Sequence, residues 1–130
     1  MPNMKIYEIE QIAVNPCVFR RAVLEGTLEV LLRNAAEESK IIERAFLSGI
    51  KNPKNHPNPD ACEYFWMECT LKEAAVIAGH LFEAEATAVP PSGETTPDVS
   101  RIGYLLDIWS HFRDWIEAGG DTSIQQRKGP

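Results

Sequence analysis

The chain has 130 residues, the usual size of one domain. Its composition, 44% hydrophobic and 25% charged, is typical of a folded globular protein and excludes a wholly disordered chain. Its 13 basic and 19 acidic side chains give a formal net charge of −6. Because nucleic acids and anionic membranes are bound by clustered Lys and Arg, this balance argues against either as a partner.

The start of the chain predicts neither export nor membrane insertion. Residues 1–11 contain one lysine and two glutamates, and they lack the basic and apolar regions of a signal peptide. No run in the chain approaches the roughly 18 apolar residues of a membrane span. Three cysteines, an odd number without a Cys-x-x-Cys pair, are typical of a reducing compartment. We therefore expect a cytoplasmic protein.

Residues 5–14 fit either a short helix or a strand. Ile6, Ile9 and Ile12 recur at intervals of three, which favours a helix. The run 6–9 also matches the start of a strand. A short helical element is the preferred prediction for this N-terminal segment.

A first long helix is predicted over residues 16–48. Asn15 is a suitable N-cap, Pro16 suits the first helical position, and Gly49 suits the end. One face of this helix is apolar. Its residues are Cys17, Leu24, Leu28, Leu31, Ala35, Ile42 and Phe46.

The length of this first helix raises a packing problem. About 33 residues in a straight helix span roughly 50 Å, because each residue adds 1.5 Å. A compact domain of this size is only about 35–40 Å across. Either the helix breaks near Gly26 or Asn34, or a second subunit covers the overhanging apolar end.

A second helix is predicted over residues 60–86, after Pro59. Asp60 and Glu63 have the spacing of a capping box. Apolar side chains cover well over half of its circumference, which is typical of a central helix with several neighbours. They are Tyr64, Trp66, Met67, Leu71, Ala74, Ala75, Ile77, Ala78, Leu81 and Phe82.

A third helix is predicted over residues 97–118. Thr96 is its candidate cap, Pro97 suits its first turn, and Gly119 with Gly120 marks its end. Its main apolar stripe consists of Ile102, Leu105, Leu106, Trp109, Phe112 and Ile116. Proline-rich stretches at 49–59 and 89–97 connect the three helices.

These elements predict an all-α protein. Residues 1–120 would form a single helical domain, a bundle of three long helices plus the short N-terminal element. Residues 121–130 end in a polar sequence and would form a flexible tail.

The third helix carries a second apolar strip, which favours a homo-oligomer. Tyr104, Ile108 and Trp115 lie apart from its main stripe, whereas a surface helix in a monomer needs only one buried stripe. Together with Ile42 and Phe46 at the end of the first helix, they form the predicted interface. The alternative is that the N-terminal segment covers this strip within the same chain.

The loop between the first two helices contains a second candidate interface. Lys51, Lys54 and His56 make a small basic group among three prolines, which keep the loop extended. Such a loop loses little entropy on binding a protein partner. The alternative is a stiff connection between helices.

Two histidines with neighbouring carboxylates are the candidate metal ligands. Asp107, His111 and Asp114 share one strip of the third helix, and His80 with Glu83 lies on the second. Imidazole and carboxylate groups together can bind a divalent metal or orient a general base. The alternative is an ordinary solvated helix face, which carries the same residue types.

The sequence therefore predicts a non-catalytic interaction protein: an adaptor, regulator, inhibitor or assembly factor. It would act as a homo-oligomer through apolar helix faces, with room to sequester a ligand or partner between subunits, and without a cofactor. No phosphate-binding loop, dinucleotide fingerprint, nucleophile elbow or His-Glu-x-x-His motif is present. The alternative is a small metal-dependent helical enzyme using the His, Asp and Glu residues above.

Overall fold

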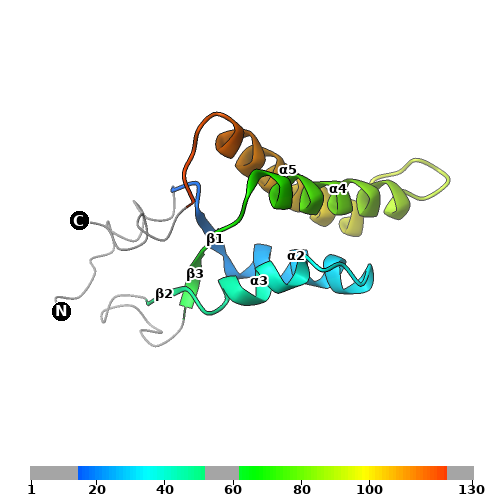
Figure 1. Ribbon diagram of the computed structural model, residues 1–130. Coiled ribbons are helices and arrows are strands. Elements are labelled where there is room, and N and C mark those ends of the chain that lie inside the picture. Colours follow the sequence, from blue (N-terminus) through cyan, green and yellow to red (C-terminus); the bar gives the residue numbers. More distant parts are fainter. Residues whose placement is uncertain (1–14, 52–61, 123–130) are drawn as a thin grey trace.

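The computed structural model describes residues 15–51 and 62–122. Helices α4 and α5 form one layer, helices α2 and α3 form a second, and a small sheet closes one end (Figure 1). In chain order the elements are β1 (Val18–Arg20), α2 (Arg21–Arg33), α3 (Ser39–Ala45), β2 (Gly49–Lys51), β3 (Cys62–Trp66), α4 (Leu71–Ala88) and α5 (Pro97–Glu117).

The prediction of an all-α bundle of three long helices is wrong. The described residues form four helices and a three-stranded antiparallel sheet in the order β1-β3-β2. Phe19 of β1 pairs with Phe65 of β3, and Ile50 of β2 pairs with Tyr64. The protein is therefore mixed α/β.

The central strand β3 lies where the second helix was predicted to begin. Its three consecutive aromatic residues, Tyr64, Phe65 and Trp66, belong to the types that favour strands. In the extended chain Phe65 points into the core and is 2% exposed, while its two neighbours are half-buried. Pairing with two strands of three residues each stabilises this conformation, and such short strands leave no periodic signal in the sequence.

Helix α4 begins at Leu71, and its cap Thr70 lies ten residues after the predicted cap at Asp60. The Thr70 hydroxyl accepts a hydrogen bond from the Glu73 N–H at 3.1 Å. The Glu73 carboxylate accepts one from the Thr70 N–H at 2.8 Å, which completes a capping box. This box satisfies two N–H groups that a helix start otherwise leaves without partners.

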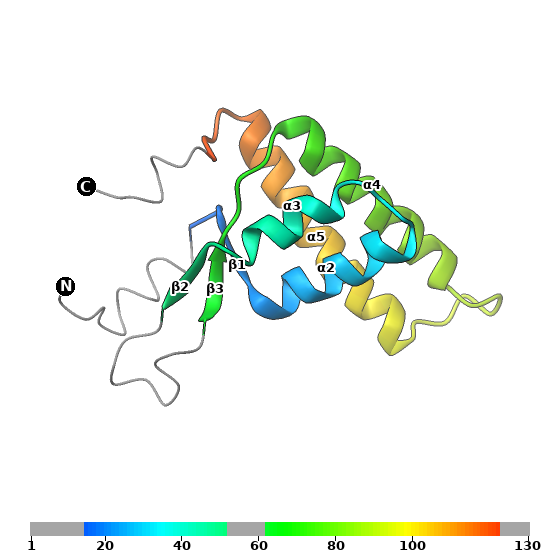
Figure 2. The same ribbon diagram turned by 60° about the horizontal axis from the view of Figure 1, so that its bottom comes forward.

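The first predicted helix is divided into β1, α2 and α3, and its break falls beside Asn34. Ala35 has a φ of 52°, in the left-handed region, so the chain turns back after Arg33. Helix α3 then lies against α2 (Figure 2). Ile42 is thereby completely buried in its own chain, and the overhang that a straight helix would create does not arise.

Helix α5 confirms the third predicted helix. The Thr96 hydroxyl accepts a hydrogen bond from the Val99 N–H at 3.2 Å, and Pro97 occupies the first turn. The helix runs antiparallel to α4 (Figure 2). Trp109, which is completely buried, donates its indole N–H to the Thr27 hydroxyl of α2 at 3.0 Å. This bond joins the two helical layers through the core.

The predicted N-terminal element at residues 5–14 lies outside the described residues, as do Lys54 and His56 of the basic loop. Of the predicted tail, Asp121 and Thr122 are described. The Thr122 hydroxyl donates a hydrogen bond to the Cys69 carbonyl at 2.9 Å.

Candidate functional site

A polar cavity of about 530 Å³ lies between the end of α2, the second half of α4 and the start of α5. His80 lines it, with Nδ1 at 3.1 Å from the Asn34 side-chain nitrogen and Nε2 at 4.0 Å from a Glu38 oxygen. Glu83 and Asp98 line the same cavity. The imidazole of His80 is thus positioned by two neighbours outside its own helix.

The predicted metal ligands do not meet. His80 and Glu83 line the polar cavity on α4, whereas Asp107, His111 and Asp114 are exposed on α5. Within residues 15–51 and 62–122, no three His, Cys, Asp or Glu side chains come together as metal ligands. The arrangement of these described residues therefore offers no support for the metal-dependent alternative.

Within the second apolar strip of α5, burial differs from residue to residue. Ile108 and Trp115 are half-buried and pack against the core, while Tyr104 is 57% exposed. The Trp115 ring stacks on Phe112 with centroids 6.0 Å apart. With Val18 and other residues near β1, Ile108 and Trp115 border a groove of about 300 Å³. The protein's own β1 region therefore covers part of the strip.

The other predicted interface residues occupy different places. Ile42 belongs to the core, and the half-buried Phe46 packs edge-on against Phe65 with ring centroids 5.2 Å apart. Lys51 ends strand β2, where its backbone pairs with Cys62. Ile42 therefore offers no surface to a second copy, whereas Phe46 keeps a partly exposed side chain.

A second apolar hollow, not found from the sequence, lies between α4 and α5 on the side away from α2. We call it the outer groove. It has a volume of about 470 Å³ and is lined by Ala75, Ala78, Gly79, Phe82, Glu83, Leu106, Ser110 and Arg113.

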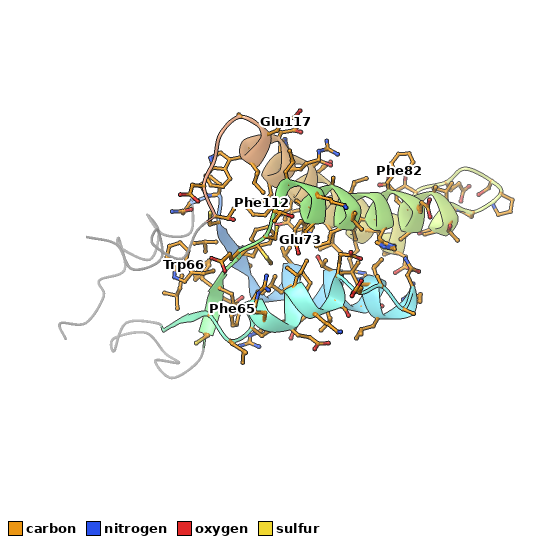
Figure 3. The ribbon with its side chains drawn as sticks, in the orientation of Figure 1. Phe65, Trp66, Glu73, Phe82, Phe112 and Glu117 are labelled. Carbon is orange, nitrogen blue, oxygen red and sulfur yellow. The ribbon has the colours of Figure 1, made fainter. Side chains whose placement is uncertain are left out.

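Phe82 stands beside the outer groove as an exposed aromatic side chain. It is 63% exposed and points away from both helical layers (Figure 3). Next to it, a Cβ added at Gly79 would meet no atom of the described chain within 4 Å, so these residues leave the helix surface open there. The sequence signal was the series Ala75, Gly79, Phe82 and Ala86, which falls on one helical face opposite Ile77 and Leu81.

Helix α4 was predicted to be a central helix because it is apolar nearly all round. It packs against α5 and α2, and its remaining face is uncovered in the described chain. Ala75, Gly79 and Phe82 on that face are all exposed. Part of the exposed apolar surface of the described residues thus lies on this face of α4.

Two buried thiols are held in the protonated form. Burial, with the Asp121 carboxylate adding to it, raises the pKa of Cys17 from 9.0 to about 11. Burial, followed by the nearby Glu73 carboxylate, raises the pKa of Cys69 from 9.0 to about 12. Because the thiolate is the nucleophilic form, neither cysteine is suited to covalent catalysis at neutral pH.

Stability is expected to fall as the pH rises above 9. The unfolded thiols lose their protons near pH 9, whereas folded Cys17 and Cys69 keep theirs to about pH 11 and 12. The stability that these two raised pKa values contribute is therefore complete below pH 9 and is lost progressively up to pH 12. Each unit by which a folded pKa exceeds the unfolded one corresponds to about 1.4 kcal/mol. Urea unfolding at pH 7, 9 and 10.5 measures this loss. The double variant Cys17→Ala/Cys69→Ala should lose less unfolding free energy over this pH range than the wild type. An equal loss in both proteins would show that these two thiols are not its cause.

The described residues form a small mixed α/β fold with partly apolar grooves on its surface. Within the described chain, no helix combines the length and hydropathy needed to cross a membrane. No protein-family model, curated protein or solved structure matches this chain.

Proposed function

We propose that this protein is a non-catalytic interaction protein of the cytoplasm, an adaptor, regulator, inhibitor or assembly factor, that works as a homo-oligomer. Its binding surfaces are the apolar faces of α4 and α5. The observation that carries the proposal is the exposure of two large aromatic side chains on these helices, Phe82 at 63% and Tyr104 at 57%.

The energetic argument rests on the size of these side chains. Burying one Phe contributes about 1.5–3 kcal/mol, and a two-fold dimer buries each contact residue twice. The outer groove supplies small side chains around Phe82, so a partner helix can approach the α4 backbone closely. Aromatic anchors beside such a hollow are typical of protein interfaces.

The chemistry of the described polar groups supports binding over catalysis. Arg101 joins Glu29 of α2 at 3.7 Å and Asp98 of its own helix at 3.3 Å, so these charges connect structural elements. The thiols of Cys17 and Cys69 are buried and protonated. Buried thiols in a chain with three cysteines also support the cytoplasmic location.

Sedimentation equilibrium over about 1–100 μM tests the proposal, because this range covers weak to moderate dimers. We expect the wild type to self-associate and the double variant Phe82→Ser/Tyr104→Ser to be monomeric. Both side chains are exposed, so the variant should keep its fold, as checked by circular dichroism.

The matched control is Leu47→Ser, which removes an 87% exposed apolar side chain after α3. It loses a similar group without touching α4 or α5, so it should associate like the wild type. A wild type that is monomeric throughout this range would overturn the proposal. Equal association of the double variant and the wild type would show that these aromatic residues are not the interface.

A further inference from the structure

The outer groove has the shape that a two-fold interface requires. In such an interface the same patch serves both copies, so each projection must meet a hollow of the same patch. Phe82 projects from α4, and Ala75 and Gly79 beside it have small or no side chains. Consider the α4 helices of two copies packed antiparallel, with the two-fold axis passing at Gly79. Phe82 then lies three positions after the axis. It therefore falls between Val76 and Ala75 of the other copy.

The charges of the outer groove are also arranged for self-pairing. Gly103 of α5 lies against the Glu85 carboxylate of α4, and the two helices run antiparallel. Ten residues further along α5, Arg113 therefore lies opposite Ala75, which is ten residues before Glu85. Glu83 and Arg113 thus mark opposite ends of the groove. Rotation about an axis at Gly79 brings Glu83 of each copy to the Ala75 end, where the other copy's Arg113 lies.

Both charged side chains are available for this pairing. Glu83 is exposed and forms no hydrogen bond or ion pair within the described residues. Arg113 contacts only the adjacent Asp114 among the carboxylates of the described chain, at 3.2 Å, and this pair is exposed. Such a surface pair contributes little, so Arg113 can change partner at small cost.

We infer that two copies of this chain pair across a two-fold axis at Gly79, with Phe82 seated in the partner's outer groove and two Glu83–Arg113 ion pairs at its ends. The inference rests on the proposed homo-oligomeric function and specifies its interface. The partner that the surface fits is thus a second copy of this chain.

Charge exchange between two variants tests this arrangement. In a dimer of the Glu83→Lys variant, the introduced lysine of one copy meets Arg113 of the other at each end of the outer groove, so two cations are brought together. In a dimer of the Arg113→Glu variant, two anions are brought together in the same way. Each variant should dimerise at least 10-fold more weakly than the wild type. Mixed in equal amounts, they should form a heterodimer. At one end the introduced lysine then meets the introduced glutamate, and at the other the unchanged Glu83 meets the unchanged Arg113.

Native mass spectrometry separates the heterodimer from both homodimers, because the two variants differ in mass. A dominant heterodimer supports the arrangement. A mixture that contains no more dimer than the separate variants overturns it. In that case a wild type that still dimerises leaves the proposed function intact, whereas a monomeric wild type defeats both proposals.

Substitution of Gly79 provides a second test, because it should stabilise the monomer and weaken the dimer at the same time. A Cβ at this position meets no atom of the described residues within 4 Å, and the substitution removes a helix-weakening glycine. We expect Gly79→Leu to raise the melting temperature of the dilute monomer and to weaken dimerisation at least 100-fold, because it separates the helices at the axis. Gly79→Ala should raise the melting temperature with a smaller effect on the dimer. Unchanged dimerisation of the leucine variant would overturn the position of the axis.

Discussion

Replacing Trp109 by alanine is expected to lower the free energy of unfolding by about 3–5 kcal/mol, the cost of truncating a buried Trp. The side chain is completely buried between Phe19 and Phe112, with ring centroids at 4.9 Å and 5.7 Å. The loss is a large part of the total stability of a small domain, about 5–15 kcal/mol. Urea unfolding followed by far-ultraviolet circular dichroism measures it.

Thr27→Val separates the hydrogen bond from the packing at this site. Valine keeps the shape of threonine but removes the acceptor of the Trp109 indole N–H, so about 1–3 kcal/mol should be lost. Thr27→Ser is the matched control, because it keeps the hydroxyl and removes only a methyl group. The double variant Trp109→Phe/Thr27→Val should lose less unfolding free energy than the sum of the losses of the two single variants, because each single change already breaks the same bond. A fully additive result would show that the bond contributes nothing.

Gly120→Ala is expected to cost about 1–3 kcal/mol through overpacking. A Cβ at Gly120 would overlap the indole ring of Trp115, which cannot move without disturbing Phe112 beneath it. Thermal unfolding gives the measurement.

Two comparisons make the Gly120 prediction specific. Gly79→Ala introduces the same methyl group into open space and should stabilise the monomer, the opposite sign. Replacing Trp115 by leucine as well should remove part of the penalty at Gly120. A Gly120→Ala protein as stable as the wild type would show that the ring and the loop rearrange freely.

Local chemistry was sufficient to predict helix α5. For the first helix it left open a break near Gly26 or Asn34 and a continuous helix covered by a second subunit. Thr96 and Pro97 satisfy the start of α5, and Gly119, with a φ of 108°, follows its end in a conformation that favours glycine. Asn34 marks a chain reversal next to Ala35. The start and end of α5 depend on neighbours within a few residues, so sequence spacing alone reveals them.

The sheet could not be predicted from the same local rules. Strands β1 and β2 have three residues each, too few for an alternating pattern. Residues 62–66 are mostly apolar and aromatic, which is compatible with a buried helix as well as with a strand. Only pairing with other segments decides in favour of the strand, such as Phe65 with Phe19 and Tyr64 with Ile50.

The candidate site was predicted only in part. Tyr104 is exposed as expected, but Ile108 and Trp115 share a groove with β1, whose existence the sequence pattern did not indicate. Phe82 was counted among the apolar residues of a central helix, and the structure leaves it exposed. Periodicity shows which side chains share a face, but not whether that face has a neighbour.

The sequence by itself determined the composition of a folded acidic domain, the helix α5 with its cap, and the excess of apolar surface over one stripe per helix. The tertiary structure alone decided where that excess lies. Formation of the sheet shortened the first two predicted helices, and the turn at Ala35 folded Ile42 into the core. Those long-range contacts buried one set of apolar residues and left one face of α4 without cover from the described residues, because burial depends on which segments meet in space.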